Sequence, residues 1–555
     1  MKFSKTLLAG IAVLALGACG KKNADSSAPQ TQSSQRAAKT SAASPLDSEF
    51  RLKGAEAIDV DALFALMPER SRPTYDNASF DKRLGATVVE NLRFSDSDDG
   101  EGVLIERAEF YGLDLDAIDL IQNADSAVLD APFETVFQKV RFFNVQTEGF
   151  EGDDANLTIG AIEFDKLSIR QGGVGGKDAK NEGALFFNAV NLAGAYFKDV
   201  SLTVQSDDTP AVGFSTPDLR FVGLGGGKLE AIIANDLEYQ MSQSATTIAA
   251  MSDMMGPQAA LLFNSPLKGI LAPENQRTTV KSFEWRGIDM SGLLEWGLKN
   301  EAPPMTAHDL IDLGTMKMAD MESFISGRSA ATIKEATITA ANFTWLAPSL
   351  IRADTIGATY DMTAYVPETE EATIKVLKDY GLDKLKGDGR AEWSWNAKSG
   401  AANLDYTANT KGLADFAMEF EFSNLKLKDI EKAKDNGADN PVEALGKFNN
   451  FKLTLADDKA LDAIFAIAAL QMGGTAKDLR QSAPMMIRLS GASMAQVNPR
   501  VSGYVDAVAD FVSKGGTLEI HAAPKEPVAF SALKGEGASP QTLPDVINLT
   551  VTHKE

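Results

Sequence analysis

Cysteine and histidine are almost absent from this sequence. Cys19 is the only cysteine among 555 residues, and the three histidines are His308, His521 and His553. A disulfide framework needs paired cysteines and is therefore excluded, and the avoidance of thiols suits an oxidising compartment. Zinc sites of the usual kind combine cysteine and histidine at short spacings, which this chain lacks. We expect each histidine to have a structural or surface role.

Basic residues are outnumbered by acidic ones. The chain has 54 lysines and arginines against 77 aspartates and glutamates, and the acidic residues are spread along the sequence rather than gathered in one block. Such a charge disfavours contact with the phosphates of nucleic acid and argues against electrostatic docking of the chain on anionic lipid. We therefore expect no nucleic-acid partner, and we attribute the charge to solubility.

Long apolar runs are missing beyond the amino terminus. The first run, Leu7–Leu16, follows Lys2 and Lys5 and is half the length of about 20 residues that a bilayer-spanning helix needs. Its length and its basic start are typical of a signal peptide. Later apolar stretches, around 245–264 and 460–472, are interrupted by polar residues. The sequence therefore predicts no transmembrane segment in the mature chain.

Small residues close the first run. Leu16-Gly17-Ala18-Cys19 resembles the lipobox of bacterial lipoproteins, a resemblance that covers residues 1–19. It implies cleavage before Cys19, a diacylglyceryl thioether on its sulfur, usually a third acyl chain on the new amino terminus, and anchoring to a membrane. An ordinary secretory signal with an incidental cysteine is the alternative. Gly20 stands where the enterobacterial sorting rule places aspartate for inner-membrane retention, so we expect the outer membrane, with the body in the periplasm.

A segment without hydrophobic periodicity follows the cysteine. Residues 20–45 are rich in serine, alanine, glutamine and proline, which is typical of a flexible tether, and the folded part is expected to begin near Phe50. The composition and the patterns below predict two folded domains with a boundary between about 300 and 330. The predicted organisation is a signal peptide at 1–18, a lipidated tether at 19–48, an N-terminal domain at 49–315 and a C-terminal domain at 316–555.

A short signature recurs in the mature chain: apolar residues alternate on both sides of one small residue. Its four clear copies begin at Ile105, Phe187, Val280 and Ile333, and looser copies begin near Phe137, Ile159 and Thr216. Alternation is typical of a half-buried strand, and the small residue suits a bulge or a tight turn. The small residues of the four copies are Gly112, Gly194, Gly287 and Ala340. We predict an α+β fold with large antiparallel, amphipathic sheets; a pentapeptide-repeat coil would need many more consecutive copies.

The C-terminal part alternates most regularly and predicts a meander. Strands are expected at 391–395, 402–406, 416–422 and 451–455, with a turn at 398–400 and a further strand at 517–520. Helices are expected at 116–121, 244–264, 291–296, 306–326, 368–380, 457–472, 475–483 and 496–514. The last helix is expected to end at Gly515, a good C-capping residue.

Three polar motifs lack residues or spacings that a phosphate-binding loop, a nucleophile elbow or a calcium-binding EF-hand requires. Gly223–Lys228 lacks the first glycine and the final Ser or Thr of a phosphate-binding loop, so we expect a turn between strands. Gly327–Ala331 lacks the second glycine of a hydrolase nucleophile elbow. The acidic segment Asp96–Glu101 offers oxygen ligands for calcium, but its spacing is not that of an EF-hand, and a solvated turn is the preferred interpretation.

Methionines form two groups that resemble the methionine clusters of periplasmic copper binders. The groups are Met316, Met318 and Met321, and Met251, Met254 and Met255. Core packing explains such stripes better than copper binding does. We therefore predict no metal, no cofactor and no catalytic residue, and the lipidated Cys19 is the only site assigned from the sequence.

These observations favour a non-catalytic cell-envelope lipoprotein that acts as a structural, assembly or binding component, with the membrane, lipid or envelope proteins as partners. The alternative is a carrier of lipid or another apolar ligand. Strands over about 90–345 resemble those of AsmA-type envelope proteins, whose sheets form hydrophobic grooves for lipid, although the transmembrane helix usual in that family is missing. A third hypothesis is a hydrolase with a dispersed active site. A closed core argues against a carrier, whereas a continuous apolar face argues for one.

Overall fold

The structure is a computed structural model of the chain. It describes residues 44–65, 72–95, 102–122, 131–148, 154–170, 182–205, 211–242, 275–345, 347–534, 539 and 542–555. Cys19 and most of the predicted tether lie outside the described residues, as do the acidic segment 96–101 and the predicted helix at 244–264 with its three methionines.

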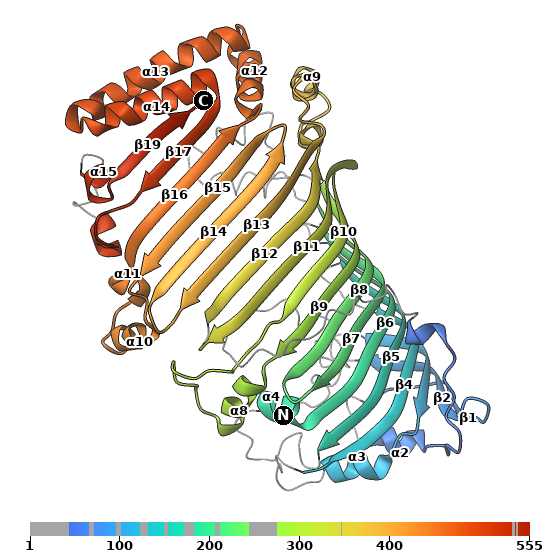
Figure 1. Cartoon of the computed structure of the whole chain (residues 1–555). Coiled ribbons are helices and arrows are strands. Elements are labelled where there is room, and N and C mark those ends of the chain that lie inside the picture. Colours follow the sequence, from blue (N-terminus) through green and yellow to red (C-terminus); the bar gives the residue numbers. More distant parts are fainter. Residues whose placement is uncertain are drawn as a thin grey trace. The chain divides into compact units, whose positions relative to one another are not determined.

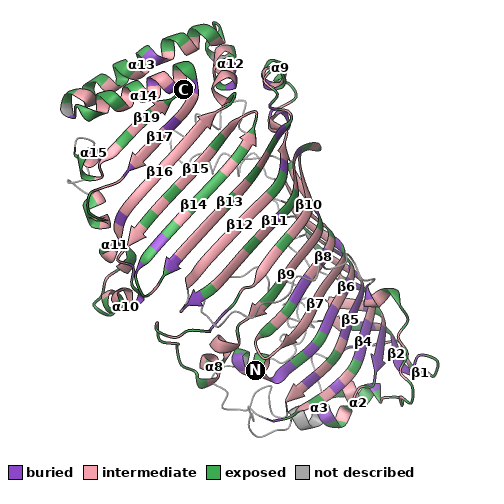
Figure 2. Cartoon of the chain, viewed as in Figure 1, coloured by how far each residue is buried: buried purple, intermediate pink, exposed green. Residues whose placement is uncertain are grey.

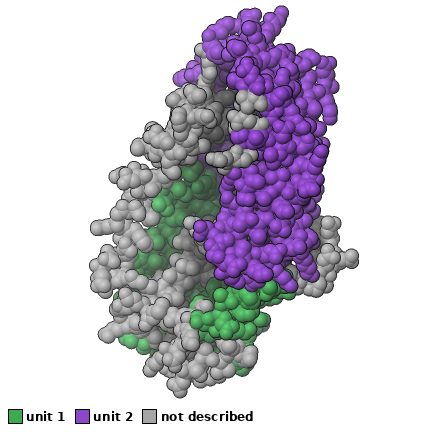
Figure 3. Space-filling view, turned by 90° about the vertical axis from the view of Figure 1, so that its left-hand side faces the viewer, with its two compact units in different colours: residues 1–242, 279–316 green, residues 243–278, 317–555 purple. Residues whose placement is uncertain are grey.

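Antiparallel strands dominate the described part of the chain, and helices are attached to them (Figure 1). The fold class is α+β with extensive antiparallel sheet, as the sequence predicted. The chain divides into two compact units, which Figure 3 colours separately: unit 1 comprises residues 1–242 and 279–316, and unit 2 comprises residues 243–278 and 317–555.

Unit 1 contains an antiparallel sheet in which each strand from β1 to β8 pairs with the next one in the sequence. Its strands are β1 (Asn77–Asp81), β2 (Ala86–Ser95), β3 (Gly102–Tyr111), β4 (Phe133–Glu148), β5 (Asp154–Arg170), β6 (Val190–Gln205), β7 (Ala211–Gly225), β8 (Lys228–Ser242) and most of β9 (Asn275–Asp289). Its helices are η2 (Pro45–Asp47), α2 (Val60–Ala65), α3 (Leu115–Gln122), α4 (Glu182–Ala189) and α8 (Ser291–Lys299).

The recurring signature folds as strands, with one correction. The copies at Ile105 and Val280 lie in β3 and β9, and the predicted short helices after them are α3 and α8. The copy that begins at Phe187 is wrong in its first residues, because α4 extends to Ala189 and the strand begins at Val190. Consecutive apolar residues before Ala189 fit a helix better than an alternating strand.

The predicted bulge at the small residue is only partly correct. Gly287 has a φ of 80° inside β9, and Gly112 has a φ of 58° where β3 ends. Gly194 lies in β6 without a left-handed φ, and in β11 the left-handed residue is Asn342 rather than Ala340. Asparagine and aspartate also tolerate a left-handed φ, and most of the left-handed residues inside strands that the signature did not identify are of these two types.

One face of the unit 1 sheet is a closed core. Phenylalanines from five adjacent strands pack edge to face, with ring centroids 5.9–6.3 Å apart: Phe110, Phe142, Phe164, Phe197 and Phe221. Val60 and Phe64 of α2 belong to the same buried cluster. Phe197 is only 1% exposed. The strands of this unit are accordingly the most deeply buried ones in Figure 2.

Unit 2 contains a second antiparallel series, in which β11 to β17 pair in sequence order, β19 pairs with β17 and β18 pairs with β16. Its strands are β10 (Thr315–Ile325), β11 (Arg328–Thr344), β12 (Ala347–Tyr360), β13 (Leu385–Asn396), β14 (Ala401–Lys411), β15 (Ala414–Ser423), β16 (Lys447–Asp457), β17 (Gly516–Ala522), β18 (Val528–Ala529) and β19 (Leu549–Lys554). Its helices are η4 (Met362–Tyr365), α9 (Glu371–Asp379), α10 (Leu427–Asp435), α11 (Pro441–Leu445), α12 (Ala460–Met472), α13 (Ala476–Val497), α14 (Arg500–Lys514), η5 (Phe530–Leu533) and α15 (Leu543–Val546).

The predicted meander is confirmed as β13 to β16, and α9, α12 and α14 match predicted helices. Gly515 ends α14 with a φ of 77° and donates its N–H to the carbonyl oxygen of Phe511. The helix predicted at 306–326 is wrong, because most of it is β10, so Met318 and Met321 do not share a helix face. The helix predicted at 475–483 continues as α13 to Val497. Within the described residues, no helix is both long and apolar enough to cross a membrane.

Candidate functional site

The sheet of unit 2 has one face made almost entirely of apolar side chains. Because alternate residues of a strand point to opposite faces, the strand pairing aligns these side chains in rows. One row consists of Ala340, Ile351, Trp393, Leu404, Phe420, Phe451, Ala522 and Leu549. The next row consists of Ile338, Ala353, Ala391, Tyr406, Met418, Leu453, Ile520 and Val551. We call this surface the apolar face.

The opposite face of the same strands is polar. Its central row consists of Thr339, Arg352, Glu392, Asp405, Glu419, Lys452, His521 and Thr550. The Glu392 carboxylate accepts hydrogen bonds from Arg390 at 2.6 Å and from Arg352 at 2.9 Å, and these hydrogen bonds hold the pKa of Glu392 below its ordinary value. The sheet is thus strongly amphipathic, with charge on one side and hydrocarbon on the other.

The apolar face is not closed like the core of unit 1. Trp393, Leu404 and Phe420 are only partly buried, as are most large side chains of the two rows. Tyr406 and Ile338 are each 38% exposed. Figure 2 shows the same contrast, since strands β12–β16 are coloured mainly as intermediate or exposed. Large side chains in a packed core have almost no exposed surface, so this face retains contact with its surroundings.

Short elements border the apolar face. At the carboxyl-terminal edge α14 packs on β17 and β19, and the Phe511 ring lies 6.4 Å from the ring of His553. At one end of the strands, Phe530 of η5 packs edge to face on Phe422, with ring centroids 5.4 Å apart. Phe422 in turn stacks on Phe420 at 4.6 Å. These aromatic contacts fix the borders of the face. Among the residues that the structure describes, the large side chains in its centre, on β12–β16, stay partly exposed.

The dimensions of the apolar face follow from strand geometry. Eight strands span it, from β11 to β17 and then β19. At about 4.8 Å between strands, the eight strands span about 34 Å, of which the five strands β12–β16 account for about 19 Å, and the two rows lie about 7 Å apart along the strands. Large apolar side chains that stay partly exposed on five adjacent strands are typical of a surface that contacts another molecule. We therefore expect this face to contact another molecule.

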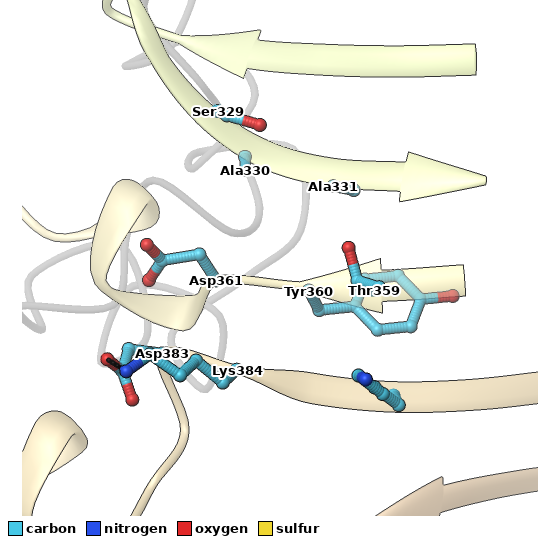
Figure 4. Close-up of a pocket in the computed structure, with 9 residues that line it drawn as sticks. Ser329, Ala330, Ala331, Thr359, Tyr360, Asp361, Asp383 and Lys384 are labelled. Carbon is cyan, nitrogen blue, oxygen red and sulfur yellow. Dashed lines mark ion pairs between the residues drawn. The ribbon is translucent and has the colours of Figure 1, made fainter. Parts of the chain in front are cut away.

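A cavity of about 210 Å³ lies beside β11, β12 and β13 (Figure 4). Its polar groups have structural roles: the Asp361 carboxylate caps η4 by accepting hydrogen bonds from the backbone N–H and the hydroxyl of Thr363, at 2.8 and 2.6 Å. The Ser329 hydroxyl donates to Glu322 at 2.7 Å. The described residues that line the cavity include no histidine, so the serine lacks the partner of a Ser-His-Asp triad here.

A second cavity, of about 550 Å³, lies in unit 1 beside the glycine-rich turn. Gly226 and Gly227 join β7 to β8 with positive φ angles, which confirms the predicted turn. Lys228 does not face an anion site, because its ammonium group pairs with the Asp289 carboxylate at 2.7 Å. The same carboxylate accepts from the backbone N–H of Ser291 at 2.9 Å, at the start of α8.

Unit 1 also buries a cluster of charges on the face opposite its core. The Glu163 side chain is fully buried and bonds to the ammonium group of Lys139 and to the Arg141 guanidinium, the latter at 2.6–2.7 Å. Arg141 also donates to the backbone carbonyl oxygens of Ser48 and Pro45. The segment 44–48, predicted as part of the flexible tether, therefore packs on the sheet, because its carbonyl groups satisfy a buried arginine.

The three histidines are far from forming a site together. His521 accepts from or donates to the Asn450 side chain at 2.9 Å on the polar face, whereas His553 contacts the Gly515 carbonyl oxygen at 2.7 Å and belongs to the apolar side. His308 is exposed in unit 1. Among the residues that the structure describes, no group of three His, Cys, Asp or Glu side chains has the geometry of a metal site.

Comparison with known proteins adds one finding about this region. A family described as "Uncharacterized protein" matches residues 407–554, which begin within β14 and end in β19. No curated protein matches the chain. The matched segment includes half of the strands that build the apolar face, together with the helices at its edge.

Proposed function

We propose that this protein is a lipid-anchored envelope protein that binds acyl chains of lipids on the apolar face of unit 2. The open apolar face is the observation that carries this proposal. Anchoring rests on the lipobox at Cys19, and the binding role agrees with the general expectation of a non-catalytic binding component. The sequence-based hypothesis of a lipid carrier expected the groove at about 90–345, whereas the apolar face lies between Ile338 and Val551.

The chemistry of the face favours hydrocarbon as the ligand. Its two central rows contain two polar atoms on large side chains, the Tyr406 hydroxyl oxygen and the Trp393 indole nitrogen, and the indole N–H donates to the Pro348 carbonyl oxygen at 3.3 Å. The other groups are aliphatic, aromatic or thioether. Burial of hydrocarbon on such a surface lowers the free energy by about 25 cal/mol per Å² removed from water. The surface offers no set of polar groups that could select a headgroup. We infer that chain length, rather than headgroup, determines what binds.

The dimensions of the face also fit acyl chains. The hydrocarbon core of a bilayer is about 30 Å thick, so one leaflet contributes about 15 Å. The partly exposed part of the apolar face, on β12–β16, measures about 19 Å across the strands, which is long enough for the acyl chain of one leaflet lying across them.

Two substitutions on β14 provide a matched test. Leu404→Glu places a carboxylate on the apolar face between Trp393 and Phe420, and Thr407→Glu places one on the polar face opposite Arg390. We expect Leu404→Glu to lose most non-covalent lipid that co-purifies with the full chain, and Thr407→Glu to retain it. Lipid extraction and quantification per protein, with circular dichroism to confirm folding, measures this. Equal lipid on both variants, or none on the unsubstituted protein, would contradict the proposal.

A further inference from the structure

Helices α12 and α13 expose large apolar side chains that the proposed acyl-binding face does not include. On α13, Met485 is 74% exposed, Met486 is 64% exposed and Leu489 is 73% exposed. At 100° per residue these three side chains fall within one sector of about 100° on the helix. Ile464, Leu470 and Met472 of α12 are also exposed. A soluble surface rarely presents six such side chains on two adjoining helices.

Another side of α13 packs on α14. Arg488 bonds to Asp506 and Asp510 of α14, at 2.8 and 2.9 Å. Gly491 lies so close to α14 that an added Cβ would be 2.3 Å from a methyl group of Val505. The orientation of α13 is therefore set by α14, and Met485, Met486 and Leu489 are held away from that interface.

The charge of this segment differs from that of the rest of the chain. Residues 459–514 contain six basic and four acidic residues, a net charge of +2 within a chain whose net charge is −23. An acidic surface is repelled by anionic lipid headgroups, and this segment has no acidic excess. Exposed Met and Leu side chains on an amphipathic helix of such charge are typical of helices that lie in the membrane interface.

We propose that α12 and α13 contact the surface of an anionic lipid bilayer, with Met485, Met486 and Leu489 inserted among the lipids. Because α14 joins α13 to the edge of the apolar face, bilayer contact here places lipid beside that face. The contact itself does not depend on the proposed acyl-chain binding and can be measured separately from it.

A fluorescent label tests this contact in the full chain. Met486→Cys is labelled with an environment-sensitive dye and mixed with vesicles of phosphatidylethanolamine and phosphatidylglycerol that contain spin-labelled lipid. We expect a blue shift and a loss of fluorescence by lipid quenching. Thr407→Cys, on the exposed polar face of the sheet, is the control and is expected to show neither. Adding Met485→Asp and Leu489→Asp is expected to abolish the quenching at position 486.

Two outcomes would overturn the proposal. Absence of a shift at position 486 in the presence of vesicles would mean that the patch does not enter the bilayer. A blue shift without vesicles that grows with protein concentration would assign the patch to contact with a second copy of the chain. Since the label at position 486 does not report acyl-chain binding on the apolar face, either outcome leaves the lipid content of the Leu404→Glu and Thr407→Glu variants as an independent result. The unsubstituted chain also tests the anchor, because a lipidated Cys19 cannot take the dye.

Discussion

Glu163→Gln tests the buried charge cluster of unit 1. The substitution preserves shape but removes the charge that Lys139 and Arg141 share inside the protein. Breaking a buried ion pair typically costs 3–5 kcal/mol, because the remaining charges stay desolvated. Here Lys139 retains Asp165 at 3.1 Å and Arg141 retains two backbone carbonyl oxygens. We therefore expect the lower end, a loss of about 3 kcal/mol in the free energy of unfolding.

Urea unfolding followed by circular dichroism measures this loss, and hydrogen exchange of the β4 and β5 amides locates it in unit 1. Glu49→Gln is the control, because Glu49 pairs with Arg83 and Arg51 at the surface, where water screens the charges. We expect that variant to unfold almost as the unsubstituted protein does. A loss below about 1 kcal/mol for Glu163→Gln would refute the view that a tight buried cluster joins segment 44–48 to the sheet.

Three further predictions concern the two faces and the turns. Phe197→Ala, in the closed core, should lower the free energy of unfolding by about 3–5 kcal/mol, whereas Phe420→Ala, on the open face, should cost about 1–2 kcal/mol in the same urea assay. Glu392 has a lowered pKa because Arg390 donates to it, so its contribution to stability is present above its unfolded pKa near 4.5 and is lost as the pH falls through the lower folded pKa. Glu392→Gln should therefore flatten the acid side of the profile of unfolding free energy against pH, and an unchanged profile would contradict this. Gly85→Ala should destabilise by more than about 1 kcal/mol, because φ is 70° and the new Cβ would lie 1.8 Å from a backbone carbonyl oxygen; an unchanged urea midpoint would contradict the turn geometry.

Much of the fold was predictable because side-chain alternation is a local signal. The segment Phe416–Phe422 alternates without a break and is a strand in the structure. The helix expected at 306–326 failed because Met316, Met318 and Met321 fit helical spacing as well as strand spacing, and pairing with distant strands decided between them. The packing of segment 44–48 on the sheet could not be predicted from the sequence, since only the fold brings Arg141 to the carbonyl oxygens of Ser48 and Pro45.

The candidate site was only half predictable. The alternation that predicted β13–β16 also predicts which residues of each strand lie on the same face, so the apolar composition of that face was predictable from the sequence. Whether another element covers them could not, because covering depends on contacts between segments far apart in the chain. Unit 1 illustrates the difference, since its equally alternating strands bury Phe164 and Phe197 in a closed core. Exposure of Tyr406 and Trp393 therefore had to come from the structure.

The most direct test of acyl-chain binding is photo-crosslinking of the full chain in the cells that produce it. A benzophenone amino acid replaces Tyr406 on the apolar face, and in a matched variant it replaces Asp405, the preceding residue, on the polar face. Mass spectrometry of the irradiated protein then identifies adducts at each position. We predict lipid adducts at position 406 and none at position 405. Protein adducts alone at position 406, or equal lipid adducts at both positions, would contradict acyl-chain binding on the apolar face.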